Sequence, residues 1–593
     1  MKRILKVGSL MAVLLLLLVP AVAQDDEIPE GSGEGGTIFY HDISDPQVIN
    51  PLMGGDTTSS AVYGRIYPTL LGVDLRDGTY SAGFAGSVAS DWTYDDTGTV
   101  LTINLRDDLV WSDGTPITAH DYVWAVEALR TGLFDTPRST QMWESLDDGT
   151  PGSGSVTDVV AVDDHTLEVT FNQSSCTSIG DLFSYLVPSH IFEEDFGDDL
   201  AAMNDEPLYY PGVTWGVWTD PEIVPGDRVS LVADFSYPDA QLGYVSPSEM
   251  VTLNLENTDV AVERFLAGEL TMIGVPGDRQ AEFLEMPDLQ TFRFERAGYV
   301  FFAFNHANPE NPQPGVDEEG NVIEQDPHPV LGDKLVRQAL VHAVDMDAII
   351  ENILAGNAVR VGIPSIPASW DWNGDLLYPF DPARAGELLD EAGWIDEDGN
   401  GIRECVSCAY LEVDPDYAGT EASIRLNANE GGSESSNQMI EAIAQSIRDV
   451  GVDAEVVFLD WASAFLPQLD GQTFDMAILA WSLGVPLDPD NRDIFSVKED
   501  VPEQGFNFGS YYNPEVEQLY EDAVNPSLTD GCSVEGRKQY YDRVNEIMFD
   551  ELPYMFMYAN LNLTAAQPWV ENWEPATFSR TWQEDAWDTV EGE

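Results

Sequence analysis

The chain has 593 residues, 43% hydrophobic and 10% aromatic, which is enough apolar material for two large lobes or about four smaller units. Its 105 acidic and 26 basic residues give a net charge of −79. This balance excludes a nucleic-acid-binding protein, because phosphate recognition needs clustered lysine and arginine, and it indicates a highly soluble surface or a salty medium.

The N-terminus predicts export. Three basic residues within 2–6 precede an unbroken apolar run over 10–19, and small residues over 21–23 supply an A-x-A cleavage site. This order is typical of a secretory signal peptide, and the run is short for a membrane span. We therefore predict a signal peptide over 1–23 and a flexible acidic linker over 24–36. The mature protein is expected to be periplasmic or extracellular and associated with the cell envelope.

Strand and helix signals alternate along the rest of the chain. Apolar residues at every second position predict strands over 100–105, 166–171 and 251–255. Capping and proline signals predict helices that begin after Thr118, Asp333, Asp345, Asp381 and Asn513. Arg337 is expected on a helix surface, and the acidic, proline-rich stretch 309–329 predicts a surface loop. Interleaving of this kind indicates an α/β protein.

Four cysteines, an even number in an oxidising compartment, indicate disulfides. Cys405 and Cys408 form a lone C-x-x-C, without the second ligand pair of a zinc site or the context of a thioredoxin motif. We predict a short structural disulfide between these two residues. The sequence is compatible with pairing of Cys176 with Cys532 but does not establish it.

One loop resembles part of a calcium-binding pattern. Asp396, Asp398 and Asn400 take its first ligand positions and Glu404 its ninth, but Ser407 stands at the twelfth, where a bidentate glutamate decides the affinity. These residues are therefore a weak calcium candidate, and a turn rich in Asp and Gly is the favoured interpretation. We expect neither a metal nor another cofactor.

No catalytic motif was found. The chain has no G-x-S-x-G, H-E-x-x-H or P-loop sequence. With 105 acidic residues, two carboxylates can be found at any spacing, so an acid pair carries no weight by itself. We therefore expect a protein that is not an enzyme, and the alternative is a secreted glycan hydrolase that uses a carboxylate pair.

Several segments, taken in chain order, resemble the extracellular solute-binding proteins of ABC importers, family 5, which include oligopeptide- and dipeptide-binding proteins. The most specific segment is LRDDLVWSDGTPITAHDYVWAVEAL, which begins at Leu105. Further segments are RQALVHAVDMDAII from Arg337, YPFDPARAGELLDEAGWIDEDGNGI from Tyr378 and FNFGSYYNPEVEQLYEDA from Phe506. Turn and cap chemistry accounts for these motifs, so they identify the family and are not expected to bind the cargo.

The resemblance implies an α/β fold, a two-lobed clamshell of the periplasmic-binding-protein type II kind with an extra subdomain in the first lobe. Lobe one would span 37–298, with the extra subdomain at about 76–185, and lobe two would span 299–555. Residues 556–593 would return to lobe one. Such clamshells close on a ligand by a hinge movement.

The resemblance also implies a monomeric receptor that captures a small ligand, a peptide or an oligosaccharide, and delivers it to the permease subunits of an ABC transporter. Trp461 and Trp481 match positions at which peptide-binding relatives place tryptophans against the ligand. Flat aromatic faces suit both kinds of cargo. Asn50, Asn305 and Tyr558 are further candidates, as polar groups on segments expected to face the ligand.

One departure from the family bears on the cargo. Peptide-binding relatives carry an aspartate three residues after the second tryptophan, which pairs with the ligand's α-amino group, and this chain has Gly484 there. Asp488 and Asp490 follow in a shifted register. Without that carboxylate an ammonium group loses a partner worth roughly 1.5 to 3 kcal/mol. The departure favours oligosaccharides, or ligands without a free amine, over free-amine peptides.

Overall fold

The computed structural model describes residues 35–589, apart from 55, 77, 83–86, 134, 135, 137, 236, 238–244, 256, 318, 319, 504, 582 and 583. The expected signal peptide, and residues 24–34 of the expected linker, lie outside the described residues. In the part of the chain that is described, no helix is both long and apolar enough to cross a lipid bilayer.

The first lobe is built on a four-stranded sheet in the order β1-β10-β9-β8. Its strands are β1 (Thr37–Asp42), β8 (Trp218–Val224), β9 (Arg228–Ala233) and β10 (Glu249–Asn254). The lobe also contains β2 (Gly72–Asp74), β3 (Thr79–Ser81), α1 (Thr57–Ile66), α6 (Thr258–Leu266) and α7 (Gln280–Leu284). Buried apolar side chains such as Ile38, Ile66 and Leu231 form its core.

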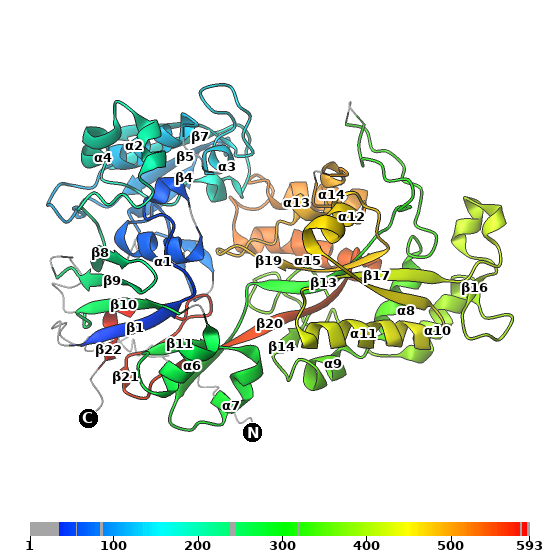
Figure 1. Cartoon of the computed structure of the whole chain (residues 1–593). Coiled ribbons are helices and arrows are strands. Elements are labelled where there is room, and N and C mark those ends of the chain that lie inside the picture. Colours follow the sequence, from blue (N-terminus) through cyan, green and yellow to red (C-terminus); the bar gives the residue numbers. More distant parts are fainter. Residues whose placement is uncertain are drawn as a thin grey trace, which may run out of the picture.

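A second, antiparallel sheet of the first lobe, in the order β4-β5-β7-β6, lies above the first sheet in Figure 1. Its strands are β4 (Ala89–Tyr94), β5 (Val100–Leu105), β6 (Val156–Asp163) and β7 (Thr166–Phe171). The helices beside it are α2 (Ala119–Arg130), α3 (Arg138–Met142) and α4 (Ser189–Phe196). Fully buried side chains of β5 and β7 alternate with less buried ones, as the period-two pattern predicts.

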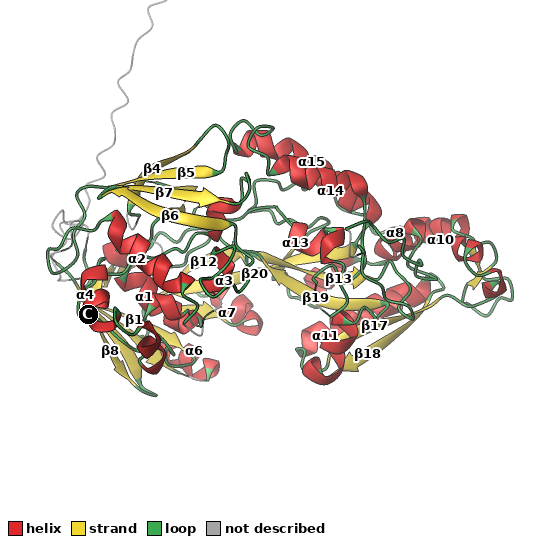
Figure 2. Ribbon diagram, turned by 90° about the horizontal axis from the view of Figure 1, so that it is seen from above, coloured by secondary structure: helices red, strands yellow, loops and turns green. Residues whose placement is uncertain are grey.

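The second lobe contains β13 (Gly298–Phe304), β14 (Ala358–Arg360), β17 (Ser423–Asn429), β18 (Asp453–Leu459) and β19 (Met476–Ser482), with the short strands β15 (Trp394–Ile395) and β16 (Glu404–Cys405). Its helices are α8 (Lys334–Ala343), α9 (Met346–Asn352), α10 (Pro382–Glu391), α11 (Glu434–Asp449), α12 (Leu466–Asp470), α13 (Arg492–Phe495), α14 (Pro514–Ala523) and α15 (Val534–Glu551). Figure 2 shows α14 and α15 along one side of this lobe and α11 on another.

The two lobes are joined through β20 (Tyr554–Ala566), which crosses from one lobe to the other in Figure 1. Its first half pairs with β13 of the second lobe, and its second half pairs with β11 (Met272–Val275) and β12 (Gln290–Glu295) of the first. The chain crosses again between β12 and β13, where the amide of Arg296 donates to the carbonyl of Asn560 at 2.9 Å. These two neighbouring crossings connect the lobes, and we refer to them as the hinge.

The C-terminal segment packs on the first lobe, next to β1 (Figure 1). It contains β21 (Val570–Glu571) and β22 (Asp588–Thr589), which pair with each other. The Glu584 carboxylate accepts from Arg65 Nη2 at 2.9 Å and from the Tyr40 hydroxyl at 3.0 Å. An ion pair and a buried hydrogen bond therefore attach this segment to α1 and β1.

The predicted helix starts are confirmed. Asp345 accepts a hydrogen bond from the amide of Ala348, and Asn513 and Asp381 cap α14 and α10, each with proline at the first turn. At Thr118 the expected capping box with Asp121 is present. Side-chain acceptors placed just before an apolar run therefore fixed these helix boundaries.

The interpretation of Arg337 was wrong. This side chain was expected on a helix surface, but it is 4% exposed and lies against the end of α15. Its guanidinium donates to backbone carbonyls, which is how a buried cation avoids the cost of unpaired donors.

Candidate functional site

The carboxyl ends of three strands meet at one edge of the second-lobe sheet. Strands β17, β18 and β19 are mutually parallel, and β19 is antiparallel to β13, with Gly298 opposite Ser482. Because β13 begins just after the chain leaves the first lobe, this edge faces the hinge and the first lobe. Ligands of open α/β sheets bind beyond the carboxyl ends of parallel strands.

Both predicted tryptophans lie at this edge. Trp461 begins the π-helical turn that follows β18, and Asp460 caps the turn by accepting from the amide of Ser463 at 2.9 Å. The indole of Trp461 is 43% exposed and stacks on Phe465, with ring centres 5.1 Å apart. It therefore offers a rigid apolar face to solvent.

Trp481 stands one residue before the end of β19 and is only partly buried. Its ring stacks on Phe301 and Phe508, with centres 6.1 and 6.0 Å away, and meets the edge of Phe506 at 5.9 Å. Phe506 is itself 50% exposed. Phe506 and Phe508 were not among the predicted site residues, although both lie in the family-like segment that begins at Phe506.

The structure does not bear out the expectation for the two asparagines. Asn50 is buried in the first lobe, where its Oδ1 accepts from the amide of Leu52 at 3.0 Å and caps a short helical turn. Asn305 is buried in the second lobe, and its Nδ2 donates to the carbonyls of Gln472 and Phe474 at 2.9 Å each. Both amides are used by the fold.

Tyr558 is also placed in the interior, at 6% exposure. It lies in the middle of β20, opposite Val300 of β13 and Arg360 of β14. Burial raises the pKa of its hydroxyl to about 12. Its ring packs in the apolar core of the second lobe, so it supports the crossing strand and does not line the tryptophan edge.

The acidic loop after Trp481 is already paired within the chain. Asp488 is held by Arg537, with Nη1–Oδ2 and Nη2–Oδ1 distances of 2.6 and 2.8 Å. Asp490 is held by Arg492, with an Nη2–Oδ2 distance of 2.7 Å. At Gly484 an added Cβ would meet no atom within 4 Å. The loop therefore presents open space at 484, and the two shifted carboxylates are engaged by guanidinium groups.

The same loop touches the first lobe. The amide of Leu487 donates to the carbonyl of Gly78, between β2 and β3, at 3.1 Å. Burial, and the nearby carboxylates of Asp488 and Asp181, raise the pKa of Tyr80 to about 12. Residues 484–490 thus lie at a contact between the lobes.

The loop over 396–404, the weak calcium candidate, forms a compact turn. Carboxylate oxygens of Asp396, Asp398 and Glu404 lie within 4.8 Å of one another. The Asp396 carboxylate accepts from the amides of Gly399 and Gly401 at 2.7 and 3.1 Å, and Asp398 accepts from the amide of Asn400 at 2.9 Å. Hydrogen bonds of this kind are those of a turn rich in Asp and Gly.

Two α/β lobes joined by a hinge, with exposed aromatic side chains at the edge that faces it, form the architecture of a solute-binding protein. The family model of the bacterial extracellular solute-binding proteins, family 5, matches residues 83–501. The chain therefore belongs to this family. Its members are binding proteins and not enzymes, which favours a receptor over the glycan hydrolase considered above.

Individual relatives align along most of the chain. The oligopeptide-binding protein AppA of Bacillus subtilis is 24% identical, covering 88% of this chain and 86% of its own. The dipeptide-binding protein of Escherichia coli is 24% identical, covering 89% of this chain and 90% of its own. The structure of B. subtilis AppA with a nonapeptide matches with a TM-score of 0.62 at 19% identity, over 95% of this chain and all of that one.

Proposed function

We propose that this protein is the cargo receptor of an ABC importer, which captures a small ligand between its lobes and delivers it to the membrane permease. The observation that carries the proposal is the aromatic edge formed by Trp461, Trp481 and Phe506, which faces the hinge. Ligand pockets are lined mainly by apolar and aromatic side chains, and aromatic rings bury large areas when a ligand is enclosed. Lobe boundaries at about 298 and 556 are part of the proposal.

A peptide is the first candidate cargo, because the relatives reported above are named for binding oligopeptides and dipeptides. An oligosaccharide, or another ligand without a free amine, is the second candidate. It is supported by Gly484 and by the pairing of Asp488 and Asp490 with arginines, which leaves no carboxylate of that loop free for an ammonium group.

A thermal-shift panel on the mature protein tests the proposal by comparing short peptides, N-acetylated peptides and oligosaccharides at matched concentration and high salt. A ligand present at 100 times its dissociation constant stabilises the folded state by about 2.7 kcal/mol. Stabilisation by a member of one class identifies the cargo. If no ligand of the panel raises the melting temperature and the protein turns over a glycan, the receptor proposal is wrong and the glycan hydrolase is the better explanation.

Trp461→Ala is expected to weaken binding of the cargo found in that panel by about tenfold or more, because truncating an aromatic anchor costs about 2 kcal/mol. The side chain is 43% exposed, so the melting temperature without ligand should change little. Phe380→Ala is the matched control and should bind normally, because this aromatic side chain is 48% exposed and lies just before α10 of the second lobe. Equal affinities of the two variants, measured by isothermal titration calorimetry, would remove Trp461 from the site.

Gly484→Asp is expected to improve binding of free-amine peptides about tenfold relative to their N-acetylated forms. The position has room for a side chain, and a charge-assisted hydrogen bond is worth roughly 1.5–3 kcal/mol. Gly484→Asn has the same shape without the charge and serves as the control. If both variants discriminate equally between free and acetylated peptides, the ligand's amine does not approach residue 484.

A further inference from the structure

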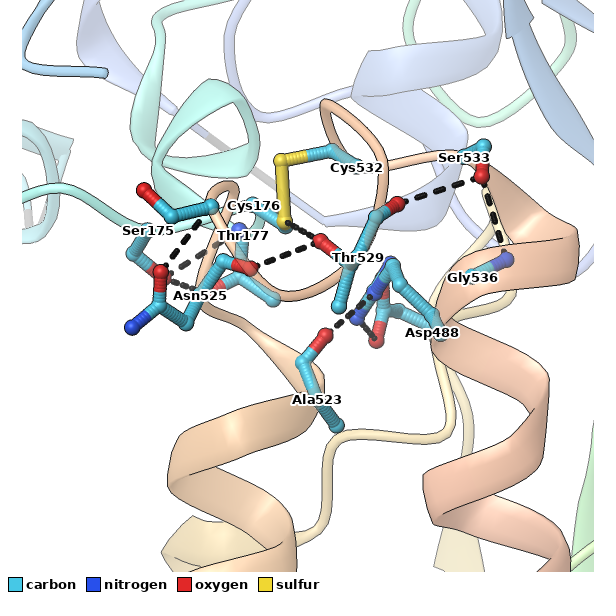
Figure 3. Close-up of a disulfide and its surroundings, with 12 residues drawn as sticks. Ser175, Cys176, Thr177, Asp488, Ala523, Asn525, Thr529, Cys532, Ser533 and Gly536 are labelled. Carbon is cyan, nitrogen blue, oxygen red and sulfur yellow. Dashed lines mark hydrogen bonds and ion pairs between the residues drawn. A yellow bond between two sulfur atoms is a disulfide. The ribbon is translucent and has the colours of Figure 1, made fainter. Parts of the chain in front are cut away.

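A disulfide joins the two lobes away from the hinge. Cys176 follows β7 in the first lobe, and Cys532 lies between α14 and α15 in the second, 356 residues further along the chain. Figure 3 shows this bond between two loops from distant parts of the sequence. Figure 1 places β7 and α14 on the upper side of the molecule and the crossing strand β20 below them.

Each end of the disulfide is built firmly into its own lobe. On the second lobe, Ser533 Oγ caps α15 by accepting from the amide of Gly536 at 3.0 Å, and Thr529 Oγ1 donates to the carbonyl of Asn525 at 2.8 Å (Figure 3). On the first lobe, the turn that follows Cys176 is held by Asp181, which accepts from the amide of Ser155 at 2.9 Å. Each cysteine is therefore held in place by hydrogen bonds within its own lobe, so the disulfide couples the movement of one lobe to that of the other.

Other contacts between the lobes surround the bond. The amide of Cys176 donates to the carbonyl of Val524, at the end of α14, at 2.7 Å. Arg492, which also holds Asp490, reaches Thr177 Oγ1 at 3.5 Å. The disulfide is thus the covalent part of a polar contact between the second sheet of the first lobe and the helices α13–α15.

A second covalent link limits what the hinge can do. The Cα atoms of Cys176 and Cys532 are 5.3 Å apart, and a disulfide holds such atoms to less than about 7 Å. A rotation about β20 that separates these two loops by more than this is blocked while the bond is intact. Without the bond, hinge closure and opening would be limited only by the non-covalent contacts between the lobes.

We propose that the Cys176–Cys532 disulfide is a latch that keeps the lobes together at their outer rim, so that cargo is exchanged by a small or twisting movement and not by full opening. The restriction of opening follows from the position of the bond. Its consequence for cargo exchange rests on the proposed receptor function.

Small-angle X-ray scattering of the ligand-free mature protein tests the latch by comparing the native chain with Cys176→Ser/Cys532→Ser. We expect the radius of gyration of the double variant to exceed the native value by about 1 Å, on a base near 25 Å for a compact chain of this length. Cys405→Ser/Cys408→Ser is the matched control, because that disulfide joins residues three apart within the second lobe. Equal radii for all three proteins would overturn the latch.

Two further measurements test the latch. If the double variant does not fold by circular dichroism, peptide mapping of the native protein under non-reducing conditions decides: a Cys176–Cys532 linked pair supports the latch, and free thiols overturn it. The scattering experiment contains no cargo, so its outcome is independent of the thermal-shift panel. Once a cargo is identified, the double variant should also release it faster than the native chain.

Discussion

Replacing Arg337 by Met should lower the free energy of unfolding of the second lobe by about 3–5 kcal/mol. The guanidinium donates through Nη1 to the carbonyl of Leu331 at 2.7 Å and through Nη2 to that of Glu551 at 2.7 Å, and Nε reaches the carbonyl of Leu552 at 3.1 Å. Removing it leaves buried acceptors without donors, at a cost of about 1–3 kcal/mol each.

Urea denaturation measures this loss. Arg384 of α10 is the matched control, because its ion pairs with Glu387 and Glu391, both at 3.0 Å, lie at the surface, where solvent screens them and they stabilise the fold little. The free energy of unfolding of Arg337→Lys should lie between those of the native protein and Arg337→Met, because an ammonium group cannot reproduce the planar fork of donors. Equal losses for Arg337→Met and Arg384→Met would show that the buried hydrogen bonds are not what stabilises this junction.

Arg337 also shows where sequence reasoning ends. Helix caps were predictable because the donor and acceptor lie within four residues of each other, as at Asp345 and Ala348. The partners of Arg337 include the end of α15, more than 200 residues away, and nothing local distinguishes this arginine from one that faces solvent. Burial of a charged group is decided by the tertiary fold.

The residues predicted for the candidate site also differ in how well their places could be foreseen from the sequence. Trp461 and Trp481 were singled out by the resemblance to peptide-binding relatives. In the structure both lie at the carboxyl ends of parallel strands, which the sheet brings together, and their contact with a ligand is a proposal. Asn50 and Asn305 looked like ligand groups, but an asparagine that satisfies backbone amides and carbonyls has the same sequence signature. Engagement of Asp488 by Arg537 spans 49 residues and was likewise invisible to local patterns.

Asp500→Asn should stabilise the protein above pH 7 and remove a pH dependence that the native chain shows between about pH 4 and 6. Asp500 is 1% exposed, and its Oδ1 accepts from Gln472 Nε2 at 2.8 Å and from Ser510 Oγ at 3.0 Å. No salt bridge to Asp500 is present among the described residues. Burial raises the pKa of its carboxyl from 3.8 to about 6, although both hydrogen bonds act in the opposite direction.

The sign follows from proton binding. Between the unfolded pKa of 3.8 and the folded pKa of about 6, the folded state keeps a proton that the unfolded state has released. Stability therefore falls as pH rises through this window, by roughly 3 kcal/mol for a shift of about two units. Asparagine carries no charge and escapes the loss, but its amide nitrogen takes the place of an acceptor oxygen, so the expected net gain at pH 8 is about 1–2 kcal/mol.

The measurement is urea denaturation of native and Asp500→Asn protein from pH 4 to 8, and the quantity of interest is the difference between the two. General repulsion among the chain's many carboxylates also grows with pH, and taking the difference cancels most of it. Asp453→Asn, at an exposed position on β18, controls for the loss of one negative charge. If the stability difference from the native protein grows between pH 4 and 6 for Asp500→Asn alone, the buried carboxylate causes the loss of stability. If it grows equally for Asp500→Asn and Asp453→Asn, the net charge of the surface causes it.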